Sequence, residues 1–502
     1  MISLFTQLRR RLLAPTILAA SLVACDQQPA GQRQGGSTAT PRASAPSAFV
    51  AARPEDLPNV VLIVVDTLRA DHLGCYGYYR DTTPNIDAFA SEALLFERAY
   101  APMATTLPSH VSMFTGLYPL EHGTLANVRH GGKAFGWNPN ITSVAELFQR
   151  NGFRTAGFVA ATPLKRVVGF GVGFDVYEEP LPHRIRAGEV NAKVLPWLRA
   201  NASQRFFLFV HYYDPHNMPY MSGPPYSTMY ETDERQQAWM SERRMPAEVA
   251  QSACRPFTRT AETINRYDGE IRYVNDELQR VLTELRDLGL YEKSVIIIAS
   301  DHGEGLNQHD WPAHGRVWNE QLHVPLLVRF PRPLHDGLPQ RFDGLVSLLD
   351  LFPTVLTRIR APFQPEFMKQ STGVDVLAED YRPRPLLGQR SGRDCGEDSG
   401  PEFALVTPEW SYLWDDAIAA DLLFARASDP HELTNVASGH TSTRDSLRSG
   451  ALALVELLRA RGAAFEQGQA GGAAELDPRV LRELEAMGYI TGAAPTSQPE
   501  HP

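Results

Sequence analysis

The sequence predicts an α/β protein in which helices cover both faces of a large, mostly parallel central sheet. Four apolar runs, rich in β-branched and aromatic residues, are typical of strands buried on both faces. Amphipathic segments with apolar residues three and four positions apart lie between these runs and predict helices. Because the two patterns alternate along the chain, they favour a layered α/β fold. The predicted strands are Asn59–Val65, Phe206–Val210, Val295–Ala299 and Val324–Phe330, and the predicted helices are Asn85–Leu94, Val144–Asn151 and Glu262–Leu288.

After about residue 360 the pattern changes to short segments that predict a smaller antiparallel sheet, over Phe403–Thr407 and Trp410–Trp414. Thr443–Arg461 has the pattern of a covering helix, and Pro478–Met487 that of a second helix after a Gly/Ala-rich link. We therefore expect a main α/β domain over 57–360, a smaller C-terminal subdomain over 361–462, and a linker, a short helix and a disordered tail over 463–502.

Composition excludes several classes of protein. The 502 residues carry 48 basic and 58 acidic side chains, a net charge of −10, whereas a nucleic-acid binder needs a basic face. The apolar fraction of 43% suits a globular core. No apolar run reaches the about 18 residues that a membrane-spanning helix requires. We expect no nucleic-acid partner.

The N-terminus has the pattern of an export signal. Arg9–Arg11 precede a short apolar stretch, and Leu22–Cys25 resembles the bacterial lipobox, whose cysteine is lipidated. The alternative is an ordinary signal peptide with a chance cysteine. We expect a lipoprotein signal peptide over 1–24, lipidation of Cys25 and a flexible tether over 25–56, since that segment is rich in Gln, Gly, Ser, Ala and Pro. The protein would then be exported and lipid-anchored to the bacterial envelope on its periplasmic face, at the inner or outer membrane.

Three cysteines remain beyond the lipobox. Export permits a disulfide, and Cys254 and Cys395 lie in loop-like sequence and could pair. Cys75 has the context of a small buried residue.

Acidic residues and histidines follow three of the predicted strands. Asp66 follows the first, His211, Asp214 and His216 belong to the segment after the second, and Asp301-His302 follow the third. In open α/β sheets ligands bind outside the carboxyl ends of the strands. Two carboxylates and an imidazole suit a divalent cation, so Asp66, Asp301 and His302 are predicted to bind Ca, Mn, Zn or Mg.

Thr106 supplies a candidate nucleophile. It lies in Thr105-Thr106-Leu-Pro-Ser109-His110, which has the signals of a helix start. A hydroxyl at a helix N-terminus that also contacts a cation is activated as an alkoxide. The alternative is that Thr106 or Ser109 only caps this helix.

Several long motifs in a fixed order resemble the sulfatase family of the alkaline phosphatase superfamily. They are NVVLIVVDTLRADHLGCYG, TPNIDAFASEALLFERAYAPMATTLPSHVSMFTGLYPLEHG, HYYDPHNMPY, IIASDHGE, LDLFPTVL and LLFARASDPHELTNVA, within residues 58–440. The resemblance implies an alkaline-phosphatase-like sandwich and an ester hydrolase. It implies a metal site of Asp66, Thr106, Asp301 and His302, and contacts of His216 and His314 with the substrate or leaving group. We expect His110 and His211 to bind substrate as well.

The chain also departs from the family pattern. Sulfatases carry a Cys or Ser that is oxidised to formylglycine, followed by Pro-Ser-Arg, where this chain has Thr106 followed by Leu-Pro-Ser-His110. The usual Asp-Asp pair reads Asp66-Thr67, and the Gly-Lys-Trp-His segment reads Phe158–Ala161. These residues resemble a threonine-nucleophile branch that cleaves phosphate esters. A second metal could bind Asp214, His216 and either His309 or His314; the alternative is that these histidines only hydrogen-bond substrate oxygens.

The sequence therefore predicts a metal-dependent hydrolase of phosphate mono- or diesters, or of sulfate esters, with phosphate favoured. One metal site is expected and a second is an alternative. The substrate would be a small-molecule or glycan ester. Three other functions stay open: an arylsulfatase-like sulfuric ester hydrolase, a phosphoethanolamine or phosphoglycerol transferase acting on envelope glycans, and a non-catalytic binding protein.

Overall fold

A computed structural model describes residues 51–129, 132–181, 183–216, 220–250, 257–390, 403–415, 420–466 and 478–486. The predicted signal peptide and tether, including Cys25, lie outside the described residues, apart from positions 51–56, and so do Cys254 and Cys395. The described residues belong to one compact unit. Within the described ranges, every helix is too short or too polar to span a bilayer.

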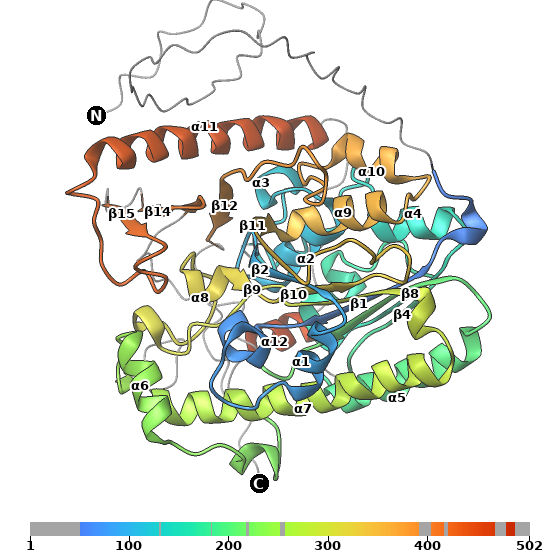
Figure 1. Ribbon diagram of the computed structural model, residues 1–502, viewed down its shortest axis with the longest axis horizontal. Coiled ribbons are helices and arrows are strands. Elements are labelled where there is room, and N and C mark those ends of the chain that lie inside the picture. The colour runs from blue at the N-terminus through green and yellow to red at the C-terminus, as the bar shows by residue number, and fades with distance from the viewer. Residues whose placement is uncertain are drawn as a thin grey trace, which may run out of the picture. The chain divides into compact units, whose positions relative to one another are not determined.

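The centre of this unit is a nine-stranded mixed sheet (Figure 1). Its strands run in the order β11-β2-β10-β8-β1-β5-β3-β4, with β9 beside β2. The five strands from β8 to β4 are parallel, whereas β10 is antiparallel to both of its neighbours. The bounds are β1 Asn59–Val65, β2 Leu94–Tyr100, β3 Arg154–Phe158, β4 Val176–Glu178, β5 Phe206–Tyr212, β8 Ser294–Ala299, β9 His323–Val324, β10 Leu326–Arg329 and β11 Arg341–Ser347.

The predicted strands are present, with one difference. The run Val324–Phe330 is divided into β9 and β10 at Pro325, which has no N–H to donate to a neighbouring strand. The predicted helix over Asn85–Leu94 is shorter than expected, since α1 ends at Ala90 and Leu94 begins the buried strand β2.

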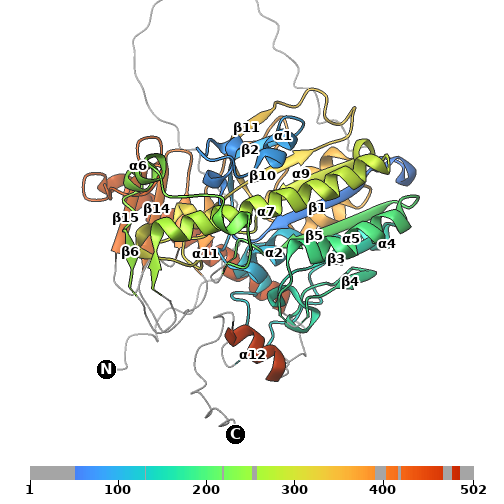
Figure 2. The ribbon, with the colours of Figure 1, turned by 90° about the horizontal axis from the view of Figure 1, so that it is seen from below.

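Helices cover the two faces of the sheet, as alternating side chains of β1 show. Val60, Leu62 and Val64 belong to one core cluster, which includes residues of α2, α4 and α9. Val61, Ile63 and Val65 belong to the other, with residues of α1, α5 and α7. Figure 1 shows the two groups on opposite sides of the sheet, and Figure 2 shows α5 and α7 crossing one face. The bounds are α1 Pro84–Ala90, α2 Thr106–Thr115, α3 Pro119–His122, α4 Val144–Arg150, α5 Ala187–Asn201, α6 Glu234–Glu242, α7 Thr260–Asp287, α8 Asn319–Leu322, α9 Leu351–Arg358 and α10 Gln364–Gln370.

The smaller C-terminal sheet is antiparallel, as predicted, and consists of β12 Leu386–Gln389, β13 Phe403–Val406, β14 Trp410–Asp415 and β15 Ala420–Ala425. The helix α11, Thr441–Glu466, packs its Ala451, Val455 and Leu458 against Tyr412 and Trp414 of this sheet. The helix α12 spans Pro478–Ala486, and β6 Glu248–Val249 pairs with β7 Thr258–Arg259. Cys75 is a partly exposed free thiol rather than fully buried.

Candidate active site

Three predicted metal ligands meet at the carboxyl edge of the central sheet. Asp66 follows β1, and Asp301 and His302 follow β8, which pairs with β1 in parallel register. One ligand atom from each residue lies within 4.8 Å of the others. His302 Nε2 is 3.8 Å from Asp66 Oδ1 and 3.5 Å from Asp301 Oδ2. The three side chains are fully buried, so the spacing of a cation site is present in a water-poor environment.

The hydrogen bonds of these residues fit a bound cation. Asp301 Oδ1 accepts the N–H of His302 at 2.9 Å and that of Thr67 at 3.3 Å. His302 donates Nδ1–H to the carbonyl of Gly303 at 2.9 Å, which leaves a lone pair on Nε2. Asp66 Oδ1, Asp301 Oδ2 and His302 Nε2 have no hydrogen-bond partner in the described part of the chain. Because unpaired buried polar atoms are costly, this set of facing atoms is explained by a divalent ion.

The electrostatics of the site lead to the same conclusion. Burial raises the pKa of Asp66, and the neighbouring Thr106 hydroxyl partly opposes this rise. Burial and the charge of Asp66 both raise the pKa of Asp301. Burial lowers the pKa of His302, which keeps its imidazole neutral and able to bind a metal. A divalent cation would balance two buried carboxylates that otherwise repel each other.

Thr106 is the first residue of α2 and is fully buried. Its hydroxyl makes no hydrogen bond of good geometry within the described ranges. Ser109, one turn on, donates its hydroxyl to the carbonyl of Asp301 at 2.6 Å and so ties α2 to the end of β8. Neither hydroxyl therefore caps the helix, and Thr106 Oγ1 remains available beside Asp66.

Asn127 is a site residue that the sequence analysis missed. Its Oδ1 accepts the N–H of Leu107 at 2.8 Å, so it caps the helix next to Thr106. Its side chain is buried, and its Nδ2 has no acceptor among the described residues. A buried amide donor held beside the candidate nucleophile Thr106 is suited to bind an anionic oxygen.

His216 and His314 form a pair beside the metal ligands. His314 donates Nδ1–H to the carbonyl of Ala104 at 3.0 Å, and its Nε2 lies 3.0 Å from Nε2 of His216. The ring centroids of His314 and His302 are 4.5 Å apart. Burial lowers the pKa of His314 to about 4, and burial together with His314 lowers the pKa of His216. The two rings therefore form a neutral pair within reach of the metal ligands.

His110 and His211 lie within the site but contact protein groups. His211 Nε2 is 3.2 Å from Asp66 Oδ2, and its Nδ1 accepts the N–H of Ala160 at 3.4 Å. His110 donates Nδ1–H to the carbonyl of Thr106 at 2.8 Å. These contacts orient the carboxylate of Asp66 and the first turn of α2, as outer partners of metal ligands do.

Asp214 and His309 face other partners. Asp214 accepts hydrogen bonds from Arg186 Nε at 2.9 Å and from the N–H of Ala187 at 3.0 Å, at the start of α5. His309 stacks on Trp318 with ring centroids 3.9 Å apart, and its Nδ1 lies 3.2 Å from Glu320 Oε1. Burial opposes a charge on His309, but Glu320 raises its pKa to about 9, which favours the protonated form of this ring.

Comparison with known proteins identifies the family of this chain. The sulfatase family model matches residues 58–360, more than half of the chain. An arylsulfatase of Clostridium perfringens is 24% identical over 447 residues, covering 76% of this chain and 90% of the relative. The phosphonate monoester hydrolase of Agrobacterium radiobacter has a similar fold, with 20% identity, a TM-score of 0.59, and coverage of 84% of this chain and 100% of the other. A protein solved with its substrate D-glucosamine-2-N,6-O-disulfate has a TM-score of 0.61 at 16% identity, covering 82% of this chain and 100% of the other.

These matches agree with the layered α/β architecture. A metal-dependent family is compatible with the buried acidic and histidine group at the carboxyl edge of the sheet. The chain belongs to the sulfatase family of ester-hydrolysing, metal-dependent enzymes.

Proposed function

We propose that this sulfatase-family enzyme hydrolyses phosphate esters, with Thr106 as its nucleophile. The observation that carries the proposal is the hydroxyl of Thr106 at the start of α2, beside Asp66, in place of an oxidisable Cys or Ser. A formylglycine hydrate releases sulfate by collapse of its own geminal diol. A threonine ester cannot do this, because its Cβ carries no second hydroxyl. Water must therefore attack the covalent intermediate, and the phosphorus of a phosphoryl group accepts this second displacement. The fold shared with a phosphonate monoester hydrolase supports the proposal.

Asp66, Asp301 and His302 would hold the divalent ion, with Thr106 Oγ1 beside it. When bound, such an ion lowers the pKa of a nearby hydroxyl and neutralises charge on phosphoryl oxygens. Thr106 Oγ1 gives up its proton to solvent and forms a bond to phosphorus as the bond to the leaving oxygen breaks, and that oxygen takes up a proton. In the second step water attacks phosphorus, the bond to Thr106 Oγ1 breaks, and the hydroxyl regains a proton.

The other site residues support this reaction. Asn127 Nδ2 would donate to a phosphoryl oxygen, which gains charge in the transition state. His216 and His314 would hydrogen-bond the leaving oxygen, and because both rings are neutral, the proton that this oxygen takes up would come from solvent water. We assign no catalytic role to Asp214, which accepts a hydrogen bond from Arg186, or to His309, which pairs with Glu320. The proposed mechanism therefore needs one metal ion.

We also propose a cellular location for the enzyme, attached to the bacterial envelope by an N-terminal lipid. The lipobox-like Leu22–Cys25 supports lipidation of Cys25, and the polar segment after it supports a tether to the bacterial envelope. The substrate would be a phosphate ester of a small molecule or glycan that reaches this surface.

A panel of three chromogenic esters tests the chemistry. Purified protein with Mn, Zn, Mg or Ca is given 4-nitrophenyl phosphate, bis-4-nitrophenyl phosphate and 4-nitrophenyl sulfate. We expect kcat/KM for one of the phosphate esters to exceed that for the sulfate by about 10²-fold or more, about 2.7 kcal/mol in transition-state binding. A higher kcat/KM for the sulfate would contradict the proposal. Release of product only when an alcohol is added would indicate a transferase.

Replacing Asn127 with alanine is expected to lower kcat/KM by about 10²-fold, as the loss of one oxyanion donor does elsewhere. The Asn127→Asp variant should be slower still, since a carboxylate beside the phosphoryl group repels it. Ion affinity, measured by calorimetric titration with Mn, should stay unchanged in both variants. Equal kcat/KM in wild type and Asn127→Ala would remove this residue from the site.

A further inference from the structure

Thr67, next to the metal ligand Asp66, has an unusual backbone conformation. Its φ is +57°, in the left-handed region that β-branched residues avoid. Its hydroxyl donates to the carbonyl of Asp66 at 2.7 Å. A left-handed conformation at a threonine persists only where surrounding contacts stabilise it. At Thr67 it turns the chain out of the direction of β1 immediately after Asp66.

The hydroxyl of Tyr267 holds this turn on both sides. It donates to the carbonyl of Thr67 at 2.7 Å and accepts the N–H of Arg69 at 2.9 Å. Tyr267 lies on α7 and is fully buried. On the opposite side, the N–H of Leu68 donates to Ser300 Oγ, at 3.0 Å, in the segment after β8. The turn is therefore fixed between α7 and the strand end that carries Asp301.

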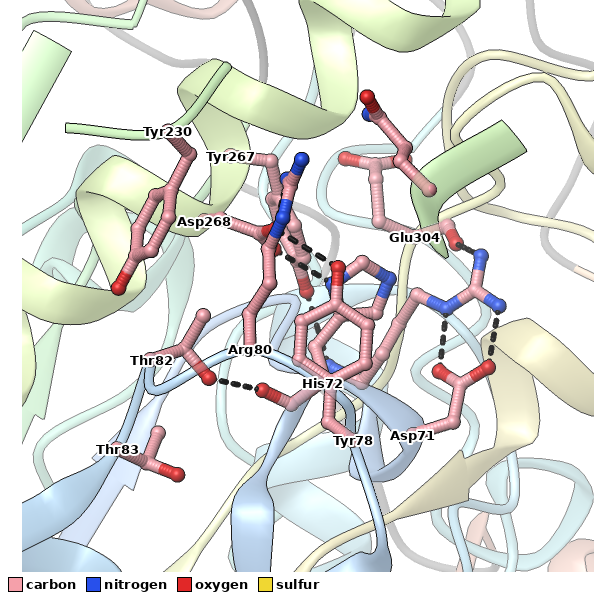
Figure 3. Close-up of polar contacts among 12 residues, drawn as sticks. Asp71, His72, Tyr78, Arg80, Thr82, Thr83, Tyr230, Tyr267, Asp268 and Glu304 are labelled. Carbon is pink, nitrogen blue, oxygen red and sulfur yellow. Dashed lines mark hydrogen bonds and ion pairs between the residues drawn. The ribbon is translucent and has the colours of Figure 1, made fainter. Parts of the chain in front are cut away.

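The neighbouring residue on α7, Asp268, holds the next part of the same segment. Its carboxylate lies 2.7 Å from His72 Nδ1 and accepts hydrogen bonds from Tyr78 and Arg80, both at 2.7 Å. Figure 3 shows these side chains gathered around Asp268, with Tyr267 beside it. Because Asp268 anchors the chain independently of Tyr267, loss of the Tyr267 hydroxyl should disturb the turn at Thr67 without releasing the whole segment.

We propose that Tyr267 is a positioning residue for the metal site: its hydroxyl keeps Thr67 left-handed and so aims the carboxylate of Asp66 at the cation. The proposal rests on the proposed metal site but not on the nature of the ester. The Tyr267 hydroxyl bonds to Thr67 and Arg69 and not to Asp66, Asp301 or His302. The proposal nevertheless requires that removal of this hydroxyl weakens ion binding. A purely structural role would lower stability and leave ion affinity unchanged.

The test uses Tyr267→Phe and a matched control, Tyr76→Phe. The Tyr76 hydroxyl also bridges two backbone groups, donating to the carbonyl of Phe96 at 2.9 Å and accepting the N–H of Leu326 at 3.0 Å. The Kd for Mn is measured by calorimetric titration, and the Tm by calorimetry without metal. We expect Tyr267→Phe to raise the Kd by about tenfold or more, as loss of an outer partner of a metal ligand does, and Tyr76→Phe to leave it within about twofold of wild type.

Thr67→Gly provides the second part of the test. Glycine adopts a positive φ freely, so in the Thr67→Gly background the Tyr267→Phe change should raise the Kd by less than about threefold. Three results would overturn the proposal: wild-type Kd in Tyr267→Phe, an equal rise in Tyr76→Phe, or an undiminished effect of Tyr267→Phe in the glycine background. Since ion binding is measured without any ester, failure of this proposal is distinguishable from failure of the proposed phosphatase activity.

Discussion

Thr106→Ala is expected to lower kcat/KM for every ester that the enzyme hydrolyses by about 10³-fold or more, because the variant has no oxygen to form the covalent intermediate. Thr106→Ser keeps an alcohol in the same position and should retain turnover within about 10²-fold of wild type, since only a methyl group is lost. Steady-state rates on the best ester of the panel measure both effects. Acid quenching during turnover, followed by mass spectrometry of the peptide that contains Thr106, should detect the substituted threonine in wild type.

The neighbouring Thr105 provides the matched control. It is the residue immediately before α2, and its hydroxyl is also buried and has no hydrogen-bond partner among the described residues. Thr105→Ala should therefore keep kcat/KM within about threefold of wild type, as expected for a group outside the bond-making machinery. Equal activities of wild type and Thr106→Ala, or equal losses in the Thr105 and Thr106 variants, would reject the nucleophile assigned here.

The main strands and the proximity of the three candidate metal ligands could be predicted from the sequence because each depends on a short-range pattern. Continuous apolar runs predict strands buried on both faces, and the residue after each such strand lies at a common edge. Asp66 follows β1 directly, and Asp301 and His302 come one residue after β8, so their proximity follows from the pairing of these strands. The sequence also contains the signal for the division of Val324–Phe330 into two strands, because Pro325 lacks the N–H that a strand interior needs.

The remaining site features depend on side-chain partners that no spacing reveals. Asp214 follows its strand like the three candidate ligands, but its carboxylate accepts a hydrogen bond from Arg186. Asn127 lies in a loop without periodicity, and its role depends on one hydrogen bond to Leu107. The left-handed conformation of Thr67 has no sequence signal, since glycine or asparagine is the usual residue there. These features follow from the packing of α2 and α7 against the strand ends.

Removal of the bound ion is expected to abolish turnover and to lower stability. Chelation followed by dialysis should lower kcat by about 10³-fold or more, because neither charge neutralisation nor activation of Thr106 remains. Restoring the ion at about 100 times its Kd should restore activity and add about 2.7 kcal/mol to the free energy of unfolding, if it binds the native state alone. Calorimetry and rate measurements on the same samples, with and without the ion, check this result. Unchanged kcat after complete removal of metal would contradict the site.

The stabilisation by the ion should also increase with pH. Burial raises the pKa values of Asp66 and Asp301 above their unfolded values, so the metal-free native state holds protons that the unfolded state releases. These two groups therefore make the metal-free protein less stable as pH rises, whereas the cation binds their deprotonated forms more tightly. The rise in Tm on adding Mn should be larger at pH 8 than at pH 5.5.

Two isosteric variants separate the pH dependence of the Mn-induced rise in Tm from the titration of other buried carboxyl groups. Asp301→Asn removes one of the repelling carboxylates, so it should lose the Mn-dependent rise in Tm and be more stable than metal-free wild type at pH 8. Asp214→Asn changes another buried carboxyl, whose pKa burial raises to about 6 and whose partner is Arg186. Because Asp214 lies outside the three-residue metal group, this variant should keep the full Mn-dependent rise. If Asp214→Asn loses the Mn-dependent rise in Tm, Asp214 contributes to the metal site after all. If Asp301→Asn keeps that rise in Tm, the ion binds elsewhere.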